Sequence, residues 1–138
     1  KTVNEWILKA ESDLKIGKDE FKTRKPATDA ICFHMQQCVE KCLKAFLIYN
    51  NVEIKKTHVL EELIKECIKI DKDFSYLFEI KAHNLTDYAV EFRYPGEILF
   101  PSKSETKNAI LIAERVKNFV LKRIGKNKNS KQLKLKNM

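Results

Sequence analysis

The chain has 138 residues, a formal net charge of +8, 43% hydrophobic residues, three glycines and three prolines. This length is typical of one domain, and so few turn-forming residues exclude an all-β protein, which needs many more turns. No apolar run approaches the roughly 20 residues of a membrane-spanning helix, and the first residues lack the apolar stretch of a secretory signal. We therefore expect a cytoplasmic, all-α protein.

The spacing of apolar residues predicts five helices. The first spans about residues 3–21, with an apolar stripe that runs from Val3 to Leu14, and Gly17 marks a close approach to another helix. Asp13 is expected on a different face from this stripe. The second helix spans about residues 29–49, with Thr28 or Asp29 as its N-cap. It is apolar on more than one side, which is typical of a helix at the centre of a bundle.

Three further helices follow along the chain. The third is short and runs from a cap at Thr57 to about residue 70. The fourth spans about residues 74–92, because Pro95 disfavours helix at the residue before it. The fifth begins after Ser102, which forms a capping-box pattern with Glu105, and ends at about residue 124 with Gly125 as its C′ residue.

Short connections between these helices favour antiparallel neighbours. The predicted fold is therefore an antiparallel up-down helical bundle of about five helices, four long or medium and one short. The bundle should occupy residues 1–124, which hold 22 basic and 19 acidic residues, a net of +3. Residues 125–138 hold five lysines and no acid, and form a basic tail that we expect to be disordered, although such a tail can also grip phosphate.

Four cysteines raise the question of a metal site, because His34, Cys38 and Cys42 follow one another at helical spacing. No paired C-x-x-C motif or second ligand cluster accompanies them, so packing of these thiols as small apolar groups is the favoured interpretation. No Gly-rich phosphate loop or Walker pattern is present. We expect no metal and no cofactor.

The second helix contains Gln37-x-x-Glu40-Lys41-x-x-Lys44-Ala45, preceded by Phe33 and His34. This pattern resembles the signature helix of HEPN domains, the higher eukaryotes and prokaryotes nucleotide-binding family. Further along the chain, Thr57-His58, Tyr88 and Arg93-Tyr94-Pro95 resemble later elements of the same family, so that the likeness covers nearly all of residues 3–124.

The resemblance implies a helical bundle that usually forms a homodimer and is associated with nucleotides or RNA. Many members pair with a minimal nucleotidyltransferase, often as a toxin–antitoxin system. Others are metal-independent ribonucleases, with Arg and His separated by four to six residues. After Arg93 the corresponding positions are Ile98, Leu99 and Phe100, so this motif is absent and no catalytic residue is predicted.

A candidate ligand-binding surface follows from the polar residues of this pattern. Lysines act as point charges and Arg as a bidentate donor towards phosphate, while Tyr rings stack on bases. The candidates are Gln37, Lys41, Lys44, Tyr88, Arg93 and Tyr94. One alternative is structural, with Glu40 pairing with Lys44. Two alternative functions are a ribonuclease toxin with a non-standard site, such as His34 with Arg93, and a dimeric scaffold that binds only protein.

Overall fold

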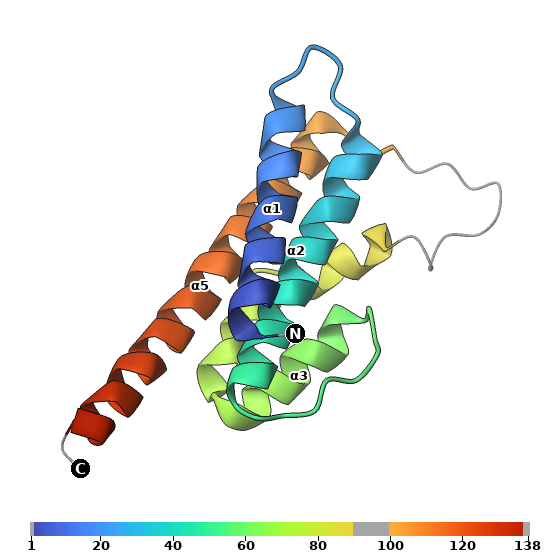
Figure 1. The fold of residues 1–138 in the computed structure, drawn as a ribbon. Helices are drawn as coiled ribbons and strands as arrows, with labels where there is room; N and C mark the ends of the chain where they lie inside the picture. Colours follow the sequence, from blue (N-terminus) through green and yellow to red (C-terminus); the bar gives the residue numbers. More distant parts are fainter. Residues whose placement is uncertain (1, 90–99, 137–138) are drawn as a thin grey trace.

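The computed structural model describes residues 2–89 and 100–136, with side chains for residues 2–89 and 100–125. Its four longer helices are α1 (Val3–Phe21), α2 (Thr28–Tyr49), α3 (Leu60–Ile70) and α5 (Lys103–Lys136). Three shorter elements follow α3, namely η1 (Lys72–Ser75), α4 (Tyr76–Glu79) and η2 (Ala82–Tyr88). Figure 1 shows α1, α2 and α5 side by side, with α3 at one end. The predicted all-α bundle is confirmed. Across these described segments, no helix is both long and apolar enough to cross a bilayer.

Helix α1 begins where the Thr2 hydroxyl accepts a hydrogen bond from the Glu5 backbone N–H at 3.1 Å. Its buried stripe includes Ala10, Leu14 and Gly17. A Cβ atom at Gly17 would overlap the terminal methyl of Met35 on α2. The predicted close approach at this glycine is therefore confirmed, and the partner is α2.

Helix α2 lies at the centre of the fold and contacts α1, α3, η2 and α5. It begins at Thr28 after Ala27, and no side chain caps it, so the predicted cap by Thr28 or Asp29 is wrong. The Glu20 carboxylate at the end of α1 accepts a hydrogen bond from the Ala27 N–H at 3.0 Å instead, and so holds the entry to α2. The helix ends at Tyr49 as predicted, with Asn50 as its C-cap, and Asn51 adopts a left-handed φ of 60°.

The segment after α2 is less regular than its apolar pattern suggested. Helix α3 begins at Leu60 rather than at the predicted cap, Thr57. The predicted continuous helix over residues 74–92 is also wrong, because Lys81 has a left-handed φ of 61° and separates α4 from η2. This turn lets Leu77 before it and Leu85 after it both enter the core. The predicted end of that helix at residue 92 lies outside the described residues.

Helix α5 begins with the predicted capping box. The Glu105 N–H donates to Ser102 Oγ at 3.0 Å, and the Ser102 N–H donates to the Glu105 carboxylate at 3.4 Å. The predicted end near residue 124 is wrong, since α5 continues through Gly125 to Lys136. An internal glycine costs a helix only about 1 kcal/mol relative to alanine, and no proline follows it. The division into residues 1–124 and a separate tail at 125–138 stays a prediction.

Candidate functional site

Polar and charged side chains on α2 lie within an otherwise apolar core. Gln36, Glu40 and Lys44 are all buried, with Glu40 only 3% exposed. Burying a charge is costly unless it is paired and hydrogen-bonded. Each of these side chains has such partners, and α2 carries two polar clusters, one with the segment before α3 and one with α1.

The first cluster is organised by the Glu40 carboxylate. Its Oε1 atom accepts a hydrogen bond from Gln36 Nε2 at 3.1 Å and lies 2.7 Å from His58 Nδ1. Its Oε2 atom accepts a hydrogen bond from Lys44 Nζ at 3.1 Å. The same lysine lies 5.7 Å from the centre of the Trp6 ring on α1. Glu40 therefore ties α2 to the segment that leads into α3.

The second cluster is organised by Asp13 on α1. Its Oδ1 atom lies 2.8 Å from His34 Nδ1, and its Oδ2 atom accepts a hydrogen bond from Lys41 Nζ at 2.6 Å. Asp13 is buried, so its expected placement away from the buried stripe is wrong. Its position three residues after Ala10 and four before Gly17 could have revealed this, because i,i+3 and i,i+4 neighbours share a helix face.

Gln37 extends the first cluster, because its side-chain amide donates to Gln36 Oε1 at 2.8 Å. The two clusters are adjacent along α2, since Glu40 of the first precedes Lys41 of the second. We call the combined set the α2 polar network. Its members are Asp13, His34, Gln36, Gln37, Glu40, Lys41, Lys44 and His58. The network reaches the surface through side chains that are 20% exposed at Lys41, 28% at His34 and 43% at His58. Of the predicted residues, Gln37 and Lys44 thus lie in the first cluster and Lys41 in the second, and each ammonium is already matched by a carboxylate.

Tyr88, another predicted site residue, lies elsewhere in the fold. Tyr88 lines a cavity of about 440 Å³ between η2 and α5, together with Asp87, Glu105 and Asn108. Burial, helped by interactions with Cys32 and Glu105, raises the pKa of Tyr88 to about 12, so the phenol stays protonated. Arg93 and Tyr94 lie outside the described residues.

The predicted stripe of His34, Cys38 and Cys42 does not form a single site. His34 contacts Asp13, whereas Cys38 and Cys42 are buried in the core as free thiols. The hydrogen bond with Cys38, reinforced by burial, raises the pKa of the Cys42 thiol well above its ordinary value. Among the side chains of residues 2–89 and 100–125, no group of three or more His, Cys, Asp or Glu is placed to hold a metal ion.

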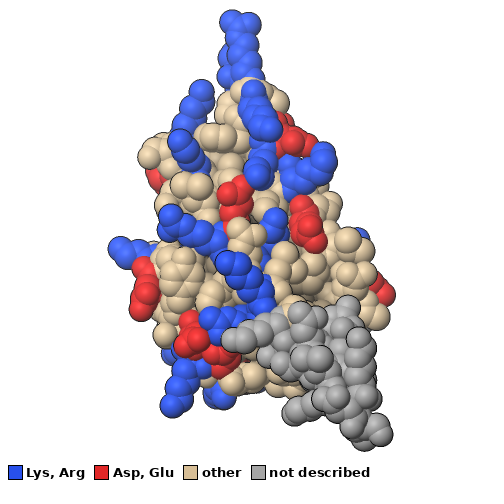
Figure 2. Space-filling view, turned by 90° about the vertical axis from the view of Figure 1, so that its left-hand side faces the viewer, with Lys and Arg blue, Asp and Glu red and all other residues tan. Residues whose placement is uncertain are grey.

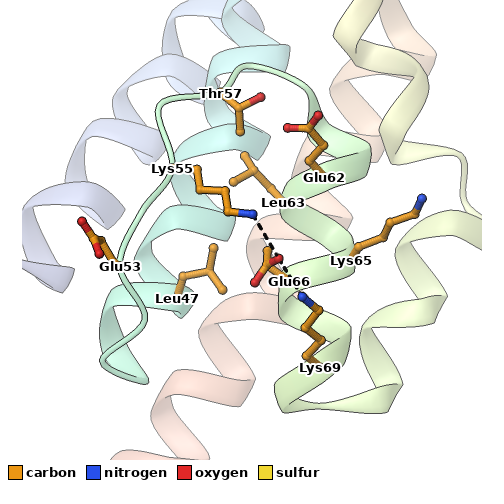
Figure 3. A pocket seen from close by; sticks show the side chains of 9 residues that line it. All are labelled: Leu47, Glu53, Lys55, Thr57, Glu62, Leu63, Lys65, Glu66 and Lys69. Carbon is orange, nitrogen blue, oxygen red and sulfur yellow. Dashed lines mark hydrogen bonds and ion pairs between the residues drawn. The ribbon is translucent and has the colours of Figure 1, made fainter.

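A second cavity, of about 370 Å³, lies between α3 and the segment that precedes it (Figure 3). Lys69 and Lys55 both contact the Glu66 carboxylate there, at 3.0 and 3.7 Å. The hydrogen bond from Lys69 is the largest cause that lowers the pKa of Glu66. Lys65 pairs with Glu61 at 3.3 Å. Because the lysines here are matched by carboxylates, this cavity offers little net attraction for an anion.

Comparison with known proteins agrees with this architecture. The model of the HEPN domain matches residues 3–124. A protein of Methanocaldococcus jannaschii named "Putative toxin MJ1304" is 32% identical over 138 residues, covering 87% of this chain and 89% of that protein. The crystal structure of ST0689, described as an archaeal HEPN homologue, superposes with a TM-score of 0.66 at 24% identity, covering 90% of this chain and 98% of that one.

The family match spans the whole arrangement built above, from the start of α1 to the last core turns of α5. It includes both carboxylates that organise the α2 polar network. The resemblance inferred from the second helix is confirmed, and this chain belongs to the HEPN domain family.

Proposed function

We propose that this chain is a toxin-type HEPN module that binds the phosphate of a nucleotide or of RNA at the α2 polar network. In this proposal it acts as a homodimer paired with a minimal nucleotidyltransferase. Family membership and the toxin name of the M. jannaschii relative support the general class. The observation that carries the ligand proposal is the fixed set of donors, Gln37, Lys41 and Lys44, beside two partly exposed imidazoles.

The network suits an anion because its donors are held in place before the ligand arrives. Asp13 and Glu40 each occupy one donor of a lysine ammonium, which has three. The remaining N–H groups of Lys41 are available at the surface. Binding side chains that are already ordered costs less conformational entropy than ordering flexible lysines. The two carboxylates balance the two ammonium charges, so hydrogen-bond geometry rather than net charge carries the attraction in this proposal.

Calorimetric titration of the full chain with ATP and with a short single-stranded RNA tests this proposal. A charge-assisted hydrogen bond contributes about 1.5–3 kcal/mol, so Lys41→Gln should weaken binding by roughly 10- to 100-fold. Glutamine keeps a donor for Asp13 and so limits damage to the fold. Lys15→Gln is the matched control, because Lys15 is an exposed lysine of α1 that pairs with Asp19 at 2.6 Å. Equal affinities in wild type and Lys41→Gln, or no binding of either ligand, would remove the proposal.

The homodimer and the enzyme partner need measurements of their own. Leu8 and Ile16, both exposed on α1, supply apolar area that a protein partner can cover. Light scattering after size exclusion should give twice the chain mass of 16.2 kDa. Co-purification with a nucleotidyltransferase from the same genome should give a stable complex. A monomer under all conditions would contradict the dimer and leave the ligand proposal standing.

A second candidate function is metal-independent cleavage of RNA, favoured by the contact between Asp13 and His34. A carboxylate that holds one imidazole nitrogen orients the other for proton transfer. Losing such a group typically costs about 10²–10⁴-fold in rate. Cleavage of RNA in the presence of a chelator, reduced to that extent by His34→Gln, would support this candidate. Absence of cleavage by the wild-type protein and its partner complex would exclude it.

A further inference from the structure

We propose that the outward face of α5 docks the sugar–phosphate backbone of RNA, at a surface separate from the α2 polar network. The surface is the α5 cationic row, which we define as Lys103, Lys107, Arg115 and Lys122. All four side chains are exposed. Their helical spacing places them within one third of the circumference, and at about 1.5 Å per residue the row extends about 28 Å. The proposal rests on the proposed function only in taking RNA as the macromolecule.

The charges of this row are not compensated by neighbours. Within the described side chains, no carboxylate oxygen lies within 4.0 Å of a charged nitrogen of these four residues. Two other cations of the same region are paired: Lys18 on α1 contacts Glu114 at 2.6 Å, and Arg123 contacts Asp73 at 2.9 Å. Figure 2 views the molecule from the left-hand side of Figure 1. On that face lysine and arginine side chains outnumber the acidic side chains.

The composition of the row favours a polyanion over a membrane. A helix that lies on a bilayer inserts an apolar face into the lipid. The apolar face of α5 is used inside the protein, since Ile112, Val116 and Val120 are buried in the core. Leu111, which is 42% exposed, interrupts the row as a single large apolar side chain. A chain of regularly repeated phosphates can meet several cations of such a row at once, and each contact releases a condensed counterion.

The salt dependence of RNA binding tests this assignment. The row variant is K103Q/K107Q/R115Q/K122Q, and the matched control is K55Q/K65Q/K69Q/K72Q, which removes the same charge from the region of α3. Fluorescence anisotropy with labelled single-stranded RNA, from about 50 to 200 mM salt, gives the slope of log K against log salt. At about 0.7 per phosphate contact, four lost contacts should reduce the slope by roughly 2–3 in the row variant. The control should keep the wild-type slope.

The outcomes separate this proposal from the proposed function. ATP binding that persists in the row variant, together with the reduced RNA slope, supports two separate surfaces. An unchanged RNA affinity and slope in the row variant overturns the α5 assignment and leaves the α2 ligand proposal intact. Equal losses in row variant and control mean that only total charge matters, which also overturns it. Stronger binding of the wild-type protein to vesicles of anionic phospholipid than to RNA would likewise overturn the α5 assignment.

Discussion

At the scale of single residues, Glu40 determines how a polar network is tolerated inside an apolar core. Its two oxygens contact one amide, one imidazole and one ammonium, from Gln36, His58 and Lys44. Because Lys44 is also buried, each member of the pair compensates the charge of the other inside the protein. Removing one partner of a buried pair is far more damaging than removing a pair at the surface.

We therefore expect Glu40→Ala to lower the free energy of unfolding by about 3–5 kcal/mol. The substitution leaves the Lys44 ammonium buried without its carboxylate. Glu40→Gln should cost less, because its amide oxygen still accepts a hydrogen bond. Urea unfolding followed by circular dichroism measures both. Asp19→Ala, which breaks the exposed pair with Lys15, should hardly change the midpoint. A midpoint for Glu40→Ala that matches Asp19→Ala would show that Glu40 does not stabilise the fold.

At the scale of elements, the contact between α1 and α2 depends on the missing side chain at Gly17. Alanine favours an interior helix position by about 1 kcal/mol over glycine. Here its Cβ would displace the methyl of the buried Met35, and overpacking a core costs about 1–3 kcal/mol. We expect Gly17→Ala to destabilise the protein on balance. Adding Met35→Ala, which removes the obstructing methyl, should make the Gly17→Ala step stabilising when the double variant is compared with Met35→Ala alone.

Gly125 provides the opposite case on α5. A Cβ at this position meets no atom within 4 Å. Gly125→Ala should therefore increase helix content by circular dichroism and stabilise α5 by up to about 1 kcal/mol, through backbone propensity alone. Gly125→Pro should shorten the helix, because proline removes a hydrogen bond and clashes with the preceding turn. Unchanged helix content in both variants would contradict a helix that continues through this residue.

The elements that could be predicted from the sequence are those with a strong local signal. The 3.6-residue period placed α1 and the body of α2 closely, and Ser102 with Glu105 marked the start of α5. The break at Lys81 has no local signal in the sequence, and its left-handed φ accompanies the burial of Leu77 before it and of Leu85 after it. For the site, Lys41 and Lys44 followed from spacing, whereas their carboxylate partner on another helix, Asp13, depends on tertiary contact.

At the scale of the whole molecule, α2 organises both the packing and the polar chemistry. It contacts α1, α3, η2 and α5, and of its network residues His34 and Lys41 are partly exposed. On the outer face of α5, by contrast, Lys103, Lys107, Arg115 and Lys122 are exposed cations. The α2 polar network and the α5 cationic row therefore lie on different parts of the fold, and the two proposals that rest on them can be tested with separate variants.

The core also contains ionisable groups that must stay neutral. Burial raises the pKa of the Cys67 thiol above its ordinary value of 9.0, and raises the pKa of Tyr88 from 10.0 to about 12. Above about pH 9 the unfolded chain loses protons that the folded chain keeps. Since the native state then binds more protons, the free energy of unfolding falls as pH rises. We expect stability to decline from about pH 9 as thiols titrate, with the contribution of Tyr88 between about pH 10 and 12.

Comparison of variants at matched pH isolates these contributions, because titration of the many lysines is common to all of them. In urea unfolding, Cys67→Ala should lose stability at neutral pH through a small cavity but lose less than wild type between neutral pH and about pH 10.5. Tyr88→Phe should behave like wild type up to about pH 10 and decline less steeply above it. Parallel pH curves for wild type and both variants would contradict this prediction, because they would mean that both groups are as accessible in the folded protein as in the unfolded chain. The structure argues against such accessibility, since Cys67 is buried and its thiol contacts the Leu43 carbonyl.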